Sequence, residues 1–120
     1  MTKTATLRFA RMLHLMIIVA ENKTTRERLQ FMRNGMENLM KFIVEEGNKI
    51  TAENFDSIDV LFYEWSLALA SIARDENADR NDKITALHLS EDLKKNKVRI
   101  DTLKNSSPQP QGIPVPNPAV

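Results

Sequence analysis

Apolar residues recur at alternating intervals of three and four positions over four long stretches of the chain. This spacing places side chains on one face of an α-helix. The clearest stripe lies within residues 52–74 and comprises Phe55, Ile58, Phe62, Trp65, Leu69 and Ile72. Leu61, Ala68 and Ala73 widen it on one side, so we expect this helix to be buried over a broad face and to organise the fold.

The other three stretches predict the helices that cover the central one. Residues 4–21 carry the stripe Leu7, Ala10, Leu13, Ile17 and Ala20, with Phe9, Met12 and Met16 beside it. Residues 25–46 carry Leu29, Met32, Met36, Leu39 and Ile43. Residues 83–104 carry a thinner stripe of Ala86, Leu89, Leu93, Asn96, Ile100 and Leu103.

The fold class follows from these four patterns. Short links on both sides of the central helix imply antiparallel neighbours. The sequence therefore predicts an all-α fold, a small antiparallel bundle of three to four helices at about 4–21, 25–46, 52–74 and 83–104.

Local signals predict where the helices begin. Thr24 followed by Glu27 fits a capping box, in which each side chain satisfies a backbone N–H group at the helix start. Thr51 is the expected N-cap of the central helix. We expect Asn81 or Asp82 to cap the fourth helix.

Two glycines bear on the second helix. Asn34-Gly35 is a turn signal, but the apolar stripe runs through it unbroken, so we predict a continuous helix. Gly35 either lets a neighbouring helix approach closely or is tolerated on the surface. Gly47 is expected just past the helix end, in the left-handed conformation that glycine tolerates.

The chain changes character after residue 104. All five prolines lie beyond residue 107, and residues 105–120 carry no charged side chain and no periodic apolar face. Such a segment cannot build a core by itself. We therefore predict one helical domain over residues 1–104, followed by a disordered Pro-rich tail.

Composition excludes several kinds of chemistry. The chain has no cysteine, which rules out disulfides, thiolate metal sites and thiol catalysis. His14 and His88 are its only histidines; His14 lies within an apolar run, and we expect it to be a partly buried structural residue. No metal-binding or catalytic motif is present, so we expect neither an enzyme nor a cofactor site.

The fourth helix raises the possibility of self-association. A narrow apolar seam with one polar residue at its centre is typical of a coiled-coil partner helix. The seam comprises Leu89, Leu93, Asn96, Ile100 and Leu103. The alternative is a helix that packs on its own bundle, with Asn96 at the water boundary.

Nucleic-acid binding is a second interpretation. The net formal charge is only +1, but basic residues gather in the second and fourth helices. They are Arg26, Arg28, Arg33, Lys94, Lys95, Lys97 and Arg99. Acidic residues interleave with both groups and no aromatic residue accompanies the second, which is more typical of a solvated helix face.

The first twenty residues also allow a third interpretation. Lys3, Arg8 and Arg11 precede an apolar run over residues 12–20, which is the pattern of a cleaved secretory signal. The run is too short to span a bilayer. We favour a first bundle helix and a cytoplasmic protein; removal of residues 1–20 would instead indicate a secreted or periplasmic one.

The methionines are a further candidate for a functional surface. Met12, Met16, Met32, Met36 and Met40 all fall in the first two helices, where they either fill a core or form an adaptable recognition surface. Exposure distinguishes these possibilities. The leading hypothesis is a non-enzymatic protein-interaction or assembly module, with homodimerisation through the fourth helix as a further expectation.

Overall fold

A computed structural model describes residues 2–106, apart from the side chains of residues 48 and 106. These residues form four α-helices and one short 3₁₀-helix, and the described range contains no strand. The elements are α1 (Lys3–Glu21), α2 (Thr25–Glu46), η1 (Gly47–Lys49), α3 (Ala52–Arg74) and α4 (Arg80–Ser106). The predicted all-α fold is confirmed. The predicted tail lies outside the described residues from residue 107 onward, whereas residues 105 and 106 belong to α4.

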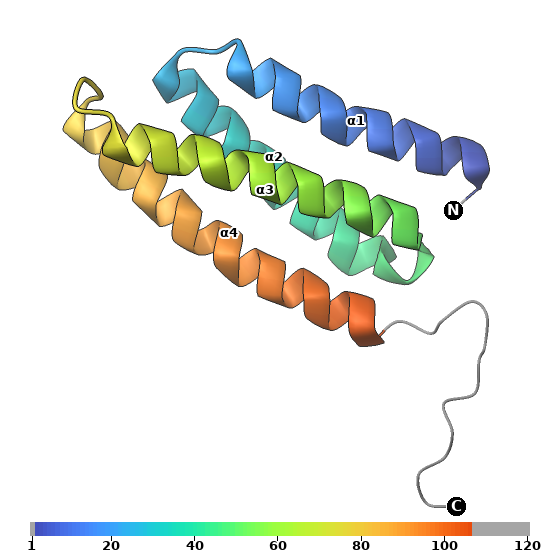
Figure 1. Ribbon diagram of the computed structural model, residues 1–120. Coiled ribbons are helices and arrows are strands. Elements are labelled where there is room, and N and C mark those ends of the chain that lie inside the picture. The colour runs from blue at the N-terminus through green and yellow to red at the C-terminus, as the bar shows by residue number, and fades with distance from the viewer. Residues whose placement is uncertain (1, 107–120) are drawn as a thin grey trace, which may run out of the picture.

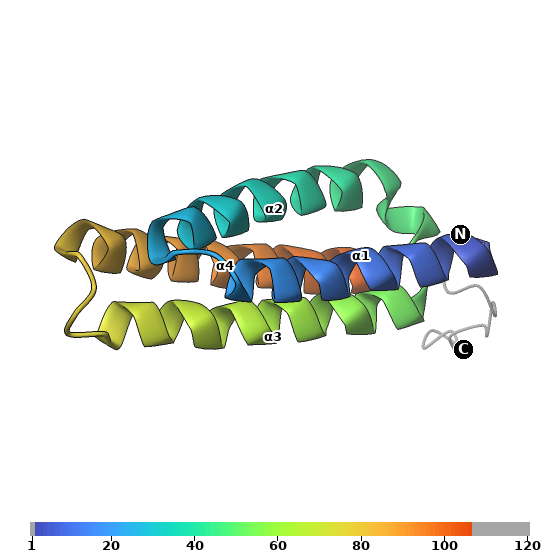
Figure 2. The same cartoon turned by 90° about the horizontal axis from the view of Figure 1, so that it is seen from above.

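The four helices alternate in direction along the chain and pack around one core (Figure 1). α3 occupies the centre, with its largest interfaces on α4 and α1, while α2 packs mainly on α4. The short link between α2 and α3 thus does not make them the main neighbours that we expected, because η1 carries the chain across the end of the bundle. Among these interfaces, the one between α1 and α2 is the smallest, and Figure 2 shows α2 diverging from α1.

The α3 stripe forms the middle of the core, as predicted. Phe55, Ile58, Phe62, Trp65, Leu69 and Ile72 are all buried, together with Leu61. Trp65 is 2% exposed and is among the largest fully buried side chains. A helix buried over so broad a face needs neighbours on several sides, which explains why α3 shares surface with both α1 and α4.

The rotation of α1 differs from the prediction. Leu7 belongs to the stripe expected to face the core, yet it is 52% exposed, and Thr6 and Phe9 are buried in its place. α1 carries apolar residues around most of its circumference, so periodicity alone does not select the buried face. The buried Asn54 side chain bonds the Thr6 carbonyl oxygen, and this contact favours the face that is observed.

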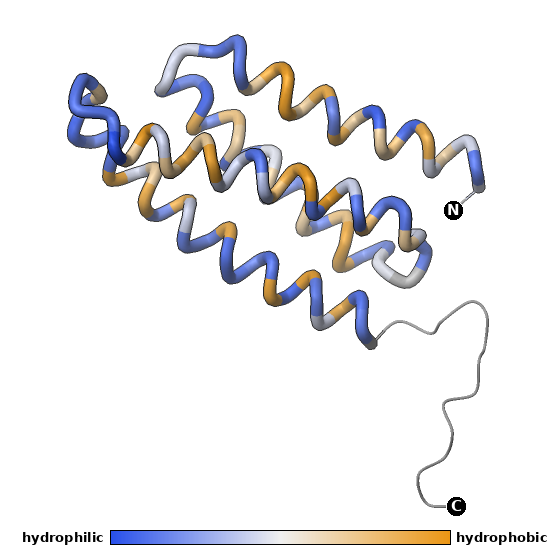
Figure 3. The backbone as a smooth tube through the Cα atoms, viewed as in Figure 1, coloured by the Kyte–Doolittle hydropathy of each residue, from blue (hydrophilic) through white to orange (hydrophobic). Residues whose placement is uncertain are grey.

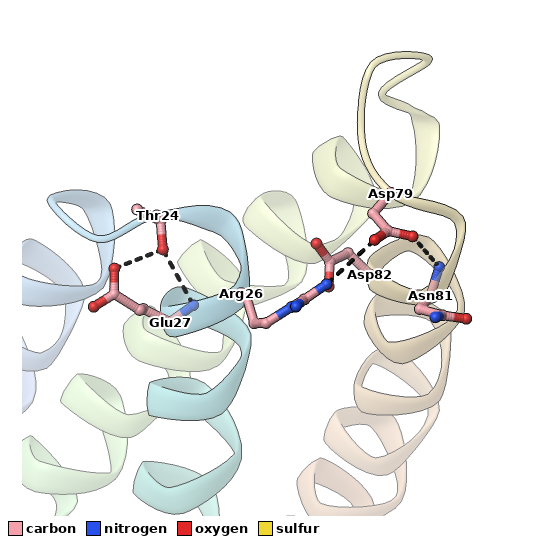
Figure 4. Close-up of polar contacts among 6 residues, drawn as sticks. All are labelled: Thr24, Arg26, Glu27, Asp79, Asn81 and Asp82. Atoms are coloured by element: carbon pink, nitrogen blue, oxygen red, sulfur yellow. Dashed lines mark hydrogen bonds and ion pairs between the residues drawn. The ribbon is translucent and has the colours of Figure 1, made fainter.

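The predicted caps of α2 and α3 are present. The Thr24 side chain accepts a hydrogen bond from the Glu27 N–H (3.5 Å), and its hydroxyl donates to the Glu27 carboxylate (2.6 Å; Figure 4). This second bond is the main reason that the pKa of Glu27 lies below its ordinary value. The Thr51 side chain accepts from the Asn54 N–H at 3.2 Å.

Two boundary predictions were wrong. Gly47 adopts right-handed helical angles (φ −57°, ψ −35°), because the chain continues into η1 rather than reversing. α4 begins at Arg80, three residues earlier than expected. Asp79 takes the capping role assigned to Asn81 or Asp82: its carboxylate accepts from the Asn81 N–H (3.0 Å; Figure 4) and its carbonyl from the Lys83 N–H.

Asn54 joins the start of α3 to α1 inside the core. It is 0% exposed, and its side-chain NH₂ donates to the Thr6 carbonyl oxygen at 3.0 Å. Its side-chain oxygen accepts from the Thr51 hydroxyl at 3.1 Å. The bond requires the Thr6 side of α1 to lie against Asn54, so it favours the observed rotation, in which Thr6 is buried and Leu7 is exposed.

Gly35 lies where three helices meet. α2 runs through it without a break, as predicted. A Cβ atom there would lie 2.8 Å from the Met16 Cε atom and 2.9 Å from the Trp65 Cη2 atom. The missing side chain therefore allows α1 and α3 to approach the backbone of α2, which decides between the two roles considered for this glycine.

We expect Asn54→Ala to lower the free energy of unfolding by about 1–3 kcal/mol, because the bond to the Thr6 carbonyl oxygen and the bond from the Thr51 hydroxyl are both lost. Asn38→Ala, at an exposed position of α2, is the matched control and should change stability little. Urea denaturation followed by circular dichroism measures both. Equal stability of the two variants would contradict a structural role for the Asn54 bond.

We expect Gly35→Ala to destabilise the protein by up to about 2 kcal/mol, since overpacking against the rigid Trp65 ring outweighs the gain in helix propensity. Gly47→Ala is the control. Nothing lies within 4 Å of its added Cβ, so it should be neutral or stabilising by up to about 1 kcal/mol. The same denaturation experiment compares them, and a Gly35→Ala protein as stable as the parent would refute the close approach.

Candidate functional site

The outer side of α1 carries apolar side chains that the bundle does not cover. Met12 is 45% exposed and Leu15 is 56% exposed; Leu7, Ile18 and Val19 are also exposed. Figure 3 shows apolar residues recurring along α1, the uppermost helix in that view. α1 therefore has more apolar surface than the core can accept.

A groove lies between α1 and α2, whose shared interface is the smallest of the helix–helix interfaces described above. It has a volume of about 450 Å³, and its apolar walls are formed chiefly by Phe9, Met12 and Met16 of α1 and by Phe31, Leu39 and Phe42 of α2. Asn34, Gly35 and Asn38 complete the α2 side.

The groove continues onto the outer face of α1. A second, shallower hollow shares Met12, Met16 and Phe31 with the first and adds Leu15 and Val19, with Arg8 and Arg11 at its edge. We call these two connected hollows the α1–α2 groove. They make one continuous apolar surface.

Aromatic rings mark the two ends of the groove. Phe9 and Phe42 pack with their ring centroids 5.2 Å apart at one end. At the other end, Phe31 packs edge-on against the buried Trp65, with the ring centroids 6.3 Å apart. The Lys23 ammonium lies 5.3 Å from the Phe31 ring centroid. Phe31 and Phe42 are only half-buried, so their rings remain available to an occupant.

The charge at the groove is one-sided. Arg8 and Arg11 line it and no carboxylate does. Within residues 2–106, no carboxylate forms an ion pair with either arginine, whereas Arg26 and Lys97 each pair with two. The groove is therefore apolar with an uncompensated positive edge.

The methionines fall into two groups. Met32, Met36 and Met40 are buried in the core and fill it in the ordinary way. Met12 and Met16 lie in the groove, where Met12 is exposed and Met16 half-buried. The interpretation as an adaptable surface therefore applies to α1 alone.

The predicted self-association seam faces the chain's own helices. Leu89, Leu93 and Ile100 are buried in the core, and Leu103 packs against it. Asn96 is half-buried at a small hollow between α2 and α4. Self-association through these five residues would require the bundle to open.

Three of the seven predicted nucleic-acid contacts form ion pairs within residues 2–106. Arg26 reaches from α2 to Asp79 (3.2 Å) and Asp82 (3.5 Å) at the start of α4 (Figure 4). Lys94 pairs with Glu91, and Lys97 faces α3.

The remaining four basic residues lie on α2 and α4. Arg33 and Lys95 lie at the α2–α4 boundary beside Glu37 and Asp92. Arg28 is half-buried and Arg99 exposed. Ion pairs within the described chain thus hold Arg26, Lys94 and Lys97.

Residues 2–106 contain no group of three or more histidine or carboxylate side chains arranged to hold a metal ion. His14 is exposed rather than partly buried, because it lies on the outer side of α1. No described helix is both long enough and apolar enough to cross a membrane.

Together the fold and the groove define a small all-α bundle with an open apolar groove between α1 and α2. No family model matches the chain, and neither a curated protein nor a solved structure is found to match it.

A second apolar hollow lies between α3 and α4, lined by Tyr63, Leu93 and Val98 among others. Lys97 crosses it and pairs with Asp59 (2.5 Å) and Asp101 (2.8 Å). Burial by itself would lower the pKa of Lys97, but the hydrogen bonds to Asp101 and Asp59 outweigh it and raise the pKa above its ordinary value. The charges of this hollow are thus satisfied within the chain.

We expect Lys97→Met to lower the unfolding free energy by no more than about 1 kcal/mol, because the ion pairs are partly exposed. A raised lysine pKa contributes stability at every pH below the ordinary value, and this is lost only as the pH rises through the raised one. The difference from the parent should therefore be constant around neutral pH and shrink in strongly alkaline solution. Lys94→Met, whose contact with Glu91 is 3.7 Å long, should show no difference in the same denaturation series.

Proposed function

We propose that this protein is a non-enzymatic protein–protein interaction module that binds its partner through the α1–α2 groove. The observation that supports the proposal is the continuous apolar surface of Met12, Leu15, Val19 and Phe31, which the bundle leaves open. Connected exposed apolar surface of this kind marks interaction sites in soluble proteins.

Energetics favour an occupied groove. Burying a Met or Leu side chain fully is worth about 1.5–3 kcal/mol, and Met12 and Leu15 keep about half of their surface in water. The flexible methionines allow the groove to adapt to its partner. A partner that covers Met12, Leu15 and the half-buried rings of Phe31 and Phe42 would recover this energy.

The two alternatives are less well supported. Self-association through α4 would use Leu89, Leu93 and Ile100, which already lie in the core. Nucleic-acid binding would use cations such as Arg26 and Lys97 that carboxylates already hold. The experiments below distinguish both alternatives from the proposed function.

A photo-crosslinking amino acid at position 15 tests the proposal in cells that naturally carry the chain. Position 87 is the matched control, because the exposed fraction of Leu87 (55%) is close to that of Leu15 and Leu87 lies on a different helix, α4. We expect one or a few protein adducts of defined mass from position 15 and none from position 87, and Met12→Glu should remove them.

Three results would contradict the proposal. Adducts with the mass of two copies of the chain would point to self-association. The same adducts from both positions would mean non-specific contact. A nanomolar dissociation constant for duplex DNA with a steep salt dependence would instead favour the nucleic-acid regulator.

A further inference from the structure

We infer that the occupant of the α1–α2 groove is an amphipathic α-helix of another protein, with acidic residues beside its apolar face. This inference rests on the proposed function and names the chemistry of the partner. It is argued from the walls of the groove, its length and its charge.

The walls favour a helix over an extended peptide. The groove offers phenylalanine, methionine and leucine side chains, and the only polar side chains within its deeper part are Asn34 and Asn38 on the α2 side. An extended peptide lying on such a surface would leave backbone N–H and C=O groups without partners. A helix satisfies these groups internally and presents only side chains to the groove.

The length of the groove matches a helix of a few turns. Its α1 wall runs from Phe9 to Val19, which at 1.5 Å per residue is roughly 15 Å. A helix that projects apolar residues at positions i, i+4, i+7 and i+11 covers about 16 Å. This is the geometry by which amphipathic helices dock into grooves between two other helices.

The charge of the edge selects acidic residues. Arg8 and Arg11 flank the apolar surface without an ion-pair partner in the described chain, and Asn34 and Asn38 leave the opposite wall neutral. Carboxylates beside the apolar face of the docked helix would meet these two arginines. Complementary charge of this kind speeds association and fixes the orientation of the partner.

The same charge disfavours a second copy of the chain. Lys3, Arg8 and Arg11 are the cations of α1, and its single acid, Glu21, lies at the far end. Two α1 faces packed together would place like charges beside one another. A flat lipid surface is disfavoured by shape, since it would touch Leu15 and Ile18 but would not reach Phe42 between the helices.

The test uses two fluorescently labelled helical peptides of about 18 residues, each with leucines at i, i+4, i+7 and i+11. One carries glutamates beside the leucines and the other carries lysines at the same positions. We expect the glutamate peptide to bind at least roughly tenfold more tightly at low salt, with the difference shrinking as salt rises. Anisotropy of the label measures binding.

Trp65 supplies a second readout within the protein. It is the only tryptophan, and its ring lies beneath Gly35, which lines the groove. Binding of peptides that lack tryptophan and tyrosine should therefore change the Trp65 emission. A peptide that binds elsewhere, such as in the α3–α4 hollow, should not cause a change in Trp65 emission that a substitution at Met12 removes.

Variants assign the binding to the groove. Leu15→Glu should abolish binding of the glutamate peptide, whereas Leu87→Glu, at an equally exposed leucine on α4, should not affect it. Arg8→Glu combined with Arg11→Glu should reverse the preference in favour of the lysine peptide. All four positions are exposed, so these substitutions leave the core intact.

Equal affinity for the two peptides would overturn the inference. So would a preference for the glutamate peptide that persists when Arg8→Glu and Arg11→Glu are combined. Binding to vesicles of phosphatidylcholine and phosphatidylserine that Leu15→Glu abolishes would also overturn it, in favour of a lipid surface. If position 15 still gives specific protein crosslinks while the acidic peptide shows no preference, only the acidic helix is wrong and the proposed function stands. If both experiments fail, both conclusions fall.

Discussion

The packing of the Trp65 indole against the bare backbone of Gly35 is the point at which α1, α2 and α3 meet. Trp65 belongs to the central helix, Gly35 to α2, and the Met16 methyl group of α1 reaches the same point. Three helices are thus positioned around one ring edge, although α2 is not a main neighbour of α3. Because α1 and α2 both rest on α3 here, they need not pack closely on each other, and the groove is the space that remains between them.

A second constraint decides what that groove displays. The hydrogen bond from Asn54 to the Thr6 carbonyl oxygen favours the observed rotation of α1 about its axis. In that rotation Phe9, Leu13 and Ala20 enter the core, and Met12, Leu15 and Val19 point away from it. A buried amide is costly to leave unpaired, so the polar contact holds an apolar face in water. The exposure of α1 is therefore a consequence of how the core is built.

The sequence predicted the parts of this structure that local chemistry determines. The α3 stripe and the caps Thr24 and Thr51 depend on residues within one helix, and all were correct. The rotation of α1, the conformation of Gly47 and the role of Asn54 depend on contacts with distant residues, which a periodic pattern does not encode. The same limit applies to the site, because an apolar stripe on α4 has the same spacing whether its own bundle or a second chain covers it. Likewise, the exposure of Met12 and the burial of Met32, Met36 and Met40 depend on tertiary packing rather than on their spacing in the sequence.

Single exposed apolar residues carry little information about function, since all folded proteins display some. Leu87 and Leu15 are nearly equally exposed, yet Leu87 lines none of the hollows described for this bundle. Leu15 continues through Met12, Val19 and Phe31 into a groove whose edge carries two arginines without an ion-pair partner among residues 2–106. By contrast, the charges around the α3–α4 hollow neutralise one another through Lys97. Apolar surface that is connected, recessed and bordered by arginines without an ion-pair partner among residues 2–106 distinguishes the α1–α2 groove from the other hollows of the bundle, and this combination is the reason for proposing the groove as the binding site.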